Sequence, residues 1–404
     1  MSRVALTLAL VLGFSVAGSV AHADEPQVSR AVAKPLKAAS EALQAKNYTE
    51  ALARTREAQA ISPRTAYDDY VIRYMQMQGF MGTNNYTEGG AAMEAIIDSP
   101  YLPSTAKPPL LLALMRIDYQ DKDYEKAIAY GQRALAAGDL SSDTPLVIAQ
   151  AYFLDNKYKE ALAGLEAIVA HDEQAGRKPT EKSLNLIWSC AIKLKDDTAA
   201  SRAVEKLILH YPKPDYWQNA MAGVLANKAT DDRLLLMTYR LMAQVGILKR
   251  GDAFTEMAQI ALDQGNPGEA QTVLEQAFAK NLYTDPHDKE RSQRLLDKVR
   301  RTAADDKASL PKAEREAGNA KTGDGLVQVG AAYLGFGQPD KALAAISAGI
   351  AKGNLKFADE SYMLLGIAYE RNKNTAEAIK AFNRATNDPK YARIAKLWAL
   401  EARS

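Results

Sequence analysis

The stretch that decides the fold is Tyr362-Met363-Leu364-Leu365-Gly366-Ile367-Ala368-Tyr369, which is followed by Ala378, Phe382, Ala385 and Pro389. The same spacing occurs about 36 residues earlier, in Leu326-x-x-Val329-Gly330-x-x-Tyr333, followed by Ala342, Ile346 and Gly349. A small residue at the glycine position lets two helices approach closely, and the later alanine fits where the second helix crosses the first. The spacing therefore predicts a repeated pair of packed helices.

The second-helix pattern recurs along the chain at intervals of about 34 to 39 residues, with two gaps of about twice that length. The predicted crossing residues are Ala51, Gly89, Ala127, Ala161, Ala200, Ala270, Ala342 and Ala378. If each double gap holds one more degenerate unit, the chain contains about ten helix pairs. A single pair cannot bury its own apolar stripe, so neighbouring pairs stack into a continuous core.

These two well-formed copies resemble the tetratricopeptide repeat. The resemblance implies an all-α fold, a right-handed α-solenoid of about ten helix pairs with a C-terminal capping helix. We expect repeats over residues 24–284 (seven units), a degenerate unit at 285–321, two well-formed units at 322–389 and the capping helix at 390–404. Residues 285–321 contain Pro286, Pro311 and few large apolar side chains, so we expect either a degenerate pair or a hinge there.

The N-terminus has the three parts of a secretory signal peptide. Arg3 supplies the positive charge, an apolar run from Val4 to Val16 follows, and Ala21-His22-Ala23 is a small-x-small cleavage pattern. We expect cleavage between Ala23 and Asp24 and a periplasmic location, with no integral membrane segment in the mature chain; the alternative is an uncleaved anchor.

Composition argues against several classes of function. The 404 residues carry 51 Lys plus Arg and 49 Asp plus Glu, a net charge of +2 without a long basic run, which disfavours nucleic acid as a partner. Cys190 is the single cysteine and lies in an apolar stretch, while His171, His210 and His287 are far apart in sequence. We therefore expect no metal, no cofactor and no catalytic site.

The expected ligand-binding surface is the concave face, which the first helices of successive repeats line. Protein or peptide partners are the ligands expected there. The basic and asparagine carboxylate clamp of chaperone-binding members of the family is not visible, so an acidic C-terminal tail is not the expected ligand. The candidate concave positions are Gln150, Phe153, Asn185, Ser189, Thr255, Gln259, Met363, Ile367 and Arg371.

The arrangement also resembles exported repeat proteins that accompany TonB–ExbB–ExbD energy transduction in Gram-negative bacteria. This resemblance rests on the signal peptide, Tyr216-Trp217, the run 257–261 and the closing run from Ala378 to Trp398. It implies a non-catalytic periplasmic scaffold with an inner-membrane transport or envelope-assembly complex as partner. A glycan-binding or cell-wall-binding module is the alternative, which predicts clustered concave aromatic residues such as Phe153 and Tyr333; an enzyme is the third hypothesis.

Overall fold

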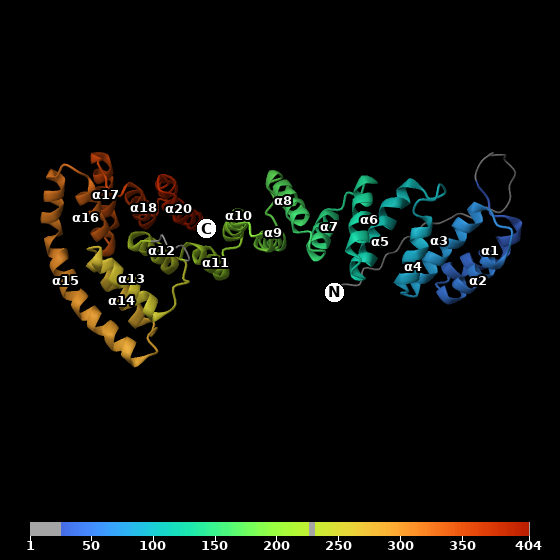
Figure 1. Ribbon diagram of the computed structural model, residues 1–404, viewed down its shortest axis with the longest axis horizontal. Coiled ribbons are helices and arrows are strands. Elements are labelled where there is room, and N and C mark those ends of the chain that lie inside the picture. The colour runs from blue at the N-terminus through green and yellow to red at the C-terminus, as the bar shows by residue number, and fades with distance from the viewer. Residues whose placement is uncertain (1–25, 226–230, 404) are drawn as a thin grey trace. The chain divides into compact units, whose positions relative to one another are not determined.

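The computed structural model describes residues 26–225 and 231–403, and within these ranges the regular structure is entirely helical (Figure 1). It comprises helices α1 to α20 and one short 3-10 helix, with no strand among the described residues. The predicted all-α class, an α-solenoid, is confirmed. The expected signal segment, residues 1–23, lies outside the described residues.

The chain forms two compact units, Met1–Ala151 and Tyr152–Ser404, and the boundary falls inside one helix. In the first unit the two helices of each pair contact each other, and α2 and α4 contact the first helix of the next pair. Leu36, Ile72, Met93 and Leu110 belong to the core of this unit. Its helices are α1 (Arg30–Gln44), α2 (Tyr48–Ala60), α3 (Ala66–Gly82), α4 (Tyr86–Ile96), the 3-10 helix (Ser104–Ala106), α5 (Lys107–Gln120), α6 (Tyr124–Ala136) and the boundary helix α7 (Asp143–Leu154).

The second unit continues the pattern with further helix pairs, interrupted by one long helix and followed by a final single helix. Its helices are α8 (Tyr158–Gln174), α9 (Glu181–Leu194), α10 (Asp197–His210), α11 (Pro214–Leu225), α12 (Asp232–Gln244), α13 (Gly251–Asp263), α14 (Pro267–Ala279), α15 (Pro286–Asn319), α16 (Asp324–Gly335), α17 (Pro339–Lys352), α18 (Ala358–Arg371), α19 (Thr375–Phe382) and α20 (Pro389–Glu401).

One turn geometry joins the two helices of most pairs. The residue after the C-cap of the first helix, or that C-cap itself, has a positive φ. The N–H of the residue that follows it donates to the carbonyl five residues earlier in the chain. Asn47 donates to Ala42 in this way at 2.8 Å, and Asn374 donates to Tyr369 at 2.9 Å. Asn47 and Asn374 then accept a hydrogen bond from the first turn of the second helix. A single short segment thus ends one helix and begins the next. The left-handed positions are Lys46, Asn84, Lys122, Asn156, Lys195, Gly265, Gly337 and Lys373.

The small residues predicted at the helix crossings are all buried. Ala51, Ala161, Ala270, Ala342 and Ala378 are each 0% exposed, and the other three predicted crossing residues are buried as well. The repeat spacing therefore identifies the points of close helix approach correctly.

The two predicted repeat glycines mark equally close approaches. A Cβ on Gly330 would lie 2.3 Å from Ile346 Cγ1, and one on Gly366 would lie 2.3 Å from Phe382 Cε1. Such separations are well inside van der Waals contact, so a side chain at either position would force the two helices of its pair apart.

The expectation for residues 285–321 needs correction. In place of a degenerate pair or a hinge, Pro286–Asn319 is one continuous helix, α15, with Pro311 inside it. Leu296, Val299 and Leu310 are buried along one side of this helix, which contacts α13, α14 and α16. The few apolar residues are enough because they recur at helical spacing on that side. The described residues therefore hold nine helix pairs, the long helix α15 and the final helix α20.

The final helix, α20, reaches beyond its neighbours in sequence. Besides α18 and α19 it contacts α10 and α12, more than a hundred residues earlier. Trp398 stacks on Phe382 with ring centroids 5.5 Å apart, and its indole Nε1 donates to the carbonyl of Met237 in α12 at 3.2 Å. Lys396 pairs with Glu205 of α10 at 2.6 Å. We call this contact of α20 with α10, α12 and α18 the closure.

Candidate functional site

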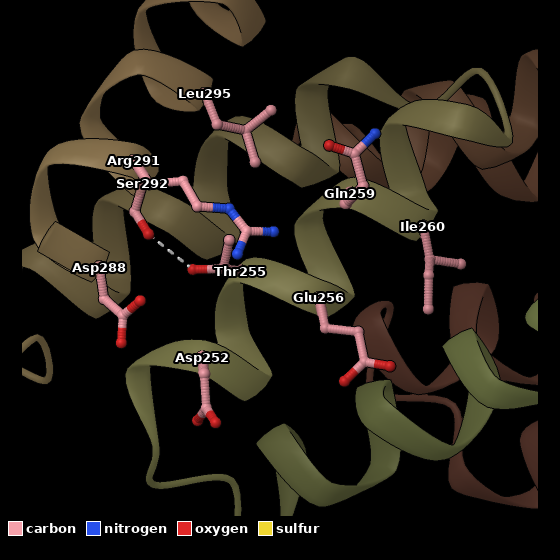
Figure 2. A pocket seen from close by; sticks show the side chains of 9 residues that line it. All are labelled: Asp252, Thr255, Glu256, Gln259, Ile260, Asp288, Arg291, Ser292 and Leu295. Carbon is pink, nitrogen blue, oxygen red and sulfur yellow. Dashed lines mark hydrogen bonds between the residues drawn. The ribbon is translucent and has the colours of Figure 1, made fainter.

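A cavity lies between α13, the first helix of its pair, and the long helix α15 that follows this pair (Figure 2). Its volume is about 510 Å³, and it opens to solvent along one side. We call it the α13–α15 groove. It is lined by Asp252, Thr255, Glu256, Gln259, Ile260, Asp288, Arg291, Ser292 and Leu295. Two of these, Thr255 and Gln259, are among the positions that the sequence predicts for the concave face.

Thr255 joins the two walls of the groove. Its hydroxyl lies 2.9 Å from the Ser292 hydroxyl of α15 and 3.0 Å from the Tyr283 hydroxyl, and it also donates to the Gly251 carbonyl at 3.0 Å. The close approach of Tyr283 depends on Gly251, because a Cβ there would lie 2.7 Å from the tyrosine ring. Ser292 is only 2% exposed and Thr255 and Tyr283 are half-buried, so this hydroxyl cluster forms a hydrogen-bonded seam at the base of the groove.

Acidic side chains dominate the groove rim. Asp252 is bound by the exposed Arg250 guanidinium, which holds the pKa of that carboxyl below its usual range. Glu256 accepts a hydrogen bond from the Tyr239 hydroxyl at 2.7 Å. Gln259 donates to Asp263 at 2.9 Å. The rim therefore presents carboxylates whose positions are held by neighbouring donors.

The opposite wall carries one acid and one base from α15. Asp288 and Arg291 are both exposed, and Figure 2 shows the Arg291 guanidinium extending into the groove. Leu295, which is half-buried, adds apolar surface beside the charged groups, and Ile260 is buried at the base of the groove with 8% of its surface exposed. Acidic, basic and apolar groups thus alternate over a short length of surface.

Asn185 and Ser189, also predicted, lie on α9 rather than in the groove. Asn185 donates from Nδ2 to the Tyr216 hydroxyl of α11 at 2.9 Å, and Tyr216 in turn donates to Glu181. Asn185 and Thr255 each occupy the fifth position of their helix and each bond to the first helix of the next unit. Ser189 donates to the Asn185 carbonyl within its own helix at 2.9 Å. Asn185 and Thr255 therefore also fix the spacing between successive first helices.

Two of the predicted concave residues are wrong as surface positions. Met363 is 0% exposed and Ile367 is 7% exposed, so neither side chain is available to a partner. The physical reason is the closure, since α18 contacts α12 and α20 in addition to α16, α17 and α19. Arg371, the last residue of α18, is exposed.

The remaining predicted positions lie on the boundary helix α7. Gln150 and Phe153 are half-buried, and the Phe153 ring packs edge-on against Tyr158 with centroids 5.4 Å apart. The nine predicted residues therefore do not form one site: two lie in the groove and two on α9. The lining residues missed are Asp252, Glu256 and Ile260 of α13 and Asp288, Arg291, Ser292 and Leu295 of α15. The helical spacing of Leu296, Val299 and Ala303 indicates a helix with one buried side in this segment. That pattern was overlooked because residues 285–321 were interpreted as a degenerate unit.

The other residues considered for chemistry have ordinary surroundings. Cys190 is 0% exposed, and burial raises the pKa of its thiol to about 11, the opposite of an activated nucleophile. Tyr333 is 3% exposed and donates to Glu314 at 2.7 Å, so it is not a concave aromatic platform. Among residues 26–225 and 231–403, no cluster of three His, Cys, Asp or Glu side chains is placed to hold a metal ion. No helix in the same ranges combines the length and apolarity needed to cross a membrane.

Comparisons with known proteins agree with the repeat class. Residues 330–392 match the family described as Tetratricopeptide repeat, so the C-terminal part of this α-solenoid carries that repeat. No curated protein matches the chain in sequence.

Several solved structures are similar to this chain at low sequence identity. A tetratricopeptide repeat protein from Parabacteroides merdae is 12% identical, with a TM-score of 0.28 over 82% of this chain and 98% of its own. The TPR2AB domain of yeast Sti1, solved in an HSP90 complex, is 14% identical, with a TM-score of 0.25 over 74% of this chain and 100% of its own. Yeast Tom70 is 12% identical, with a TM-score of 0.25 over 91% and 87%.

Proposed function

We propose that the protein is a non-catalytic scaffold that binds an extended segment of a partner protein in the α13–α15 groove. The observation that carries the proposal is the groove itself, about 510 Å³ and open to solvent, between the first helix α13 and the long helix α15. First helices are the elements that line the binding face of a helical repeat array. Two residues that the repeat register assigns to this face, Thr255 and Gln259, line the groove.

The chemistry of the groove fits a peptide better than a sugar or a reaction intermediate. Carboxylates, an amide and a guanidinium stand beside the apolar side chains of Ile260 and Leu295, which is the mixture that peptide grooves offer to backbone and side chains. None of the nine lining residues is aromatic, so there is no ring on which a sugar would stack. The one lining hydroxyl pair, Thr255 and Ser292, is hydrogen-bonded to itself with no histidine base among the lining residues.

Site-specific photo-crosslinking tests this proposal. A photoreactive amino acid replaces Gln259 in the groove or, as the matched control, Gln271 on the second helix α14. Both variants are expressed in the native host and irradiated, and adducts are identified by mass spectrometry. We expect a discrete protein adduct from position 259 that is absent from position 271. Equal adducts at both positions, or none at 259 with native complexes intact, would contradict the proposal.

The place of action is proposed from the N-terminal sequence pattern. The basic, apolar and Ala21-His22-Ala23 segments support export through a cleavable signal and a periplasmic location. The mature N-terminus is then Asp24, which N-terminal sequencing of the protein from cell fractions tests directly. A chain that starts at Met1 in the membrane fraction would favour the uncleaved anchor.

The identity of the partner is proposed from the family resemblance. An inner-membrane energy-transducing complex of the TonB type, or an envelope-assembly complex, is the partner expected for such an exported scaffold. The adduct from position 259 decides this, since a TonB, ExbB or ExbD adduct supports the first and an assembly protein supports the second. An adduct with a protein outside the envelope would contradict both.

A further inference from the structure

The closure contains a pair of glutamates whose placement is electrostatically unfavourable. Glu370 is on the last turn of α18, and Glu401 is the last residue of α20. Gln244, the last residue of α12, donates to Glu370 Oε1 at 3.0 Å and lies 3.4 Å from Glu401 Oε1. Three helices therefore bring their C-terminal ends to one point, and two of the ends contribute a carboxyl group.

Helix C-termini make this point unfavourable for negative charge. Each one carries a partial charge of about −0.5 from its unsatisfied carbonyls. Two ionised carboxylates at the same place would add two full negative charges, and Gln244 supplies only a neutral amide. Because the Gln244 amide reaches an oxygen of both carboxyls, the two are close neighbours, and a proton on one of them relieves their mutual repulsion.

The neighbouring charges do not relieve the pair. From α18, Arg371 acts on Glu370 and lowers its pKa, but burial, the hydrogen bond with Glu401 and the charge of Glu401 outweigh it and raise the pKa of Glu370 to about 8. Several other charged side chains on the packed helices form ion pairs away from these two carboxyls. These pairs are Arg240 with Glu269, Arg233 with Glu360, Lys396 with Glu205 and Lys380 with Glu377.

We propose that the Glu370–Glu401 pair is a proton-dependent latch, which holds α20 against α12 and α18 while it shares a proton and weakens that contact as pH rises. The pair sits where the C-terminal ends of all three helices meet, so its repulsion acts directly on the docking of α20. Release of α20 would uncover the indole of Trp398 and the faces of α12 and α18 that it contacts. The latch thus regulates access to an inner surface of the second unit.

The sign and the pH window follow from the raised pKa. In the docked state Glu370 keeps its proton up to about pH 8, whereas a released glutamate loses it near its ordinary value of about 4.3. Below both values the docked and released states bind the same protons, and docking is strongest. Between them the released state binds fewer protons, so the docking equilibrium shifts toward release by at most about tenfold per pH unit. Above about pH 8 the dependence ends.

Hydrogen–deuterium exchange of the full-length protein from pH 5 to pH 9, corrected for intrinsic exchange rates, tests the latch. We expect protection of residues 389–401 to fall progressively toward pH 8, while protection of α13 and α14 stays constant. The variants Glu370→Gln and Glu401→Gln remove the charge repulsion, and either one should flatten the pH dependence and keep α20 docked at pH 8. The control Glu316→Gln, on the exposed surface of α15, should behave as the unmodified protein.

Two results would overturn the latch. One is protection of α20 that is independent of pH in the unmodified protein. The second is a pH dependence that survives unchanged in both glutamine variants. If either glutamine variant unfolds, its counterpart carries the test, because each removes one of the two charges. None of these results depends on the α13–α15 groove, so the latch and the proposed binding function can fail separately.

Discussion

The α13–α15 groove and the closure show two different environments for the first helix of a repeat pair, and both lie in the compact unit Tyr152–Ser404. In the groove, the first helix α13 is joined to α15 by the hydrogen bond between Thr255 and Ser292, and Gln259 of α13 stays exposed to solvent. At the closure, another first helix, α18, is additionally covered by α12 and α20, and its residues Met363 and Ile367 are core. Repeat register alone therefore does not decide whether a position is a binding surface.

The difference comes from an element outside the repeat. Helix α20 follows the last helix pair of the described residues, and it contacts helices that belong to earlier repeats. Among the described residues no comparable helix covers the groove, and Asp288 and Arg291 in the first two turns of α15 are exposed beside α13. The non-repeat helices thus determine which part of the array is accessible.

The largest expected effect comes from removing the central side chain of the closure. Trp398→Ala deletes a fully buried ring and its hydrogen bond to Met237, and large aromatic deletions of this kind cost about 3–5 kcal/mol. Denaturant unfolding monitored by circular dichroism should show this loss. The control Lys390→Ala, at an exposed position of α20, should change stability by less than about 0.5 kcal/mol. A similar small effect of Trp398→Ala would mean that the closure does not stabilise the unit.

Two glycine substitutions should have opposite signs. Gly366→Ala places a methyl group 2.3 Å from the Phe382 ring and should destabilise by about 1–3 kcal/mol through overpacking. Gly318→Ala lies in α15 with nothing within 4 Å of the new methyl group, and it should stabilise by about 0.5–1 kcal/mol through helix propensity. Thermal unfolding of both variants measures the difference. Destabilisation by both would remove the evidence that Gly366 is a close-packing position.

The hydroxyl seam below the groove should contribute less than the closure. Thr255→Val keeps the shape but leaves the buried Ser292 hydroxyl with fewer partners, which costs about 1–3 kcal/mol. Ser189→Ala loses only a hydrogen bond within its own helix and should cost less than about 0.5 kcal/mol. Chemical denaturation compares the two, and equal costs would show that Thr255 does not join α13 to α15.

The smallest effect on stability is expected at the groove surface. Arg291→Glu changes an exposed side chain and should alter the free energy of unfolding by less than about 0.5 kcal/mol. It should nevertheless reduce the yield of the partner adduct formed from position 259, because it reverses a charge inside the groove. The control Arg301→Glu lies on an exposed position of the same helix and outside the lining, so it should leave the yield unchanged. Equal yields from both variants would place the partner elsewhere.

Local features of this fold were predictable from the sequence because they depend on local spacing. Gly366 and Ala378 lie where the two helices of one repeat cross, and both are buried as the spacing predicts. The turns were marked by Gly265 and Gly337, which take up positive φ values. Thr255 and Gln259 were predicted as concave-face positions from the register of their own pair, and the structure places both in the groove lining.

Contacts between distant repeats were not predictable in the same way. The apolar face of 390–404 shows that α20 needs a covering surface, but nothing in its spacing says that α10 and α12 provide it. Met363 and Ile367 were misassigned for that reason. The continuous helix α15 was missed because Pro286 and Pro311 were interpreted as helix breakers. In the structure Pro286 occupies the N-terminus of α15, and Pro311 lies within the helix.

The division of the inner surface into an open groove and a closed contact is tested most directly by comparing their accessibility. Single cysteines replace Gln259 or Met363 in a Cys190→Ala background, and the rate of thiol labelling is measured under native conditions at pH 7. We predict fast labelling at 259, which is exposed, and labelling at least about a hundredfold slower at 363, which is buried. Equal rates at the two positions would show that α20 does not cover α18, and would contradict that division.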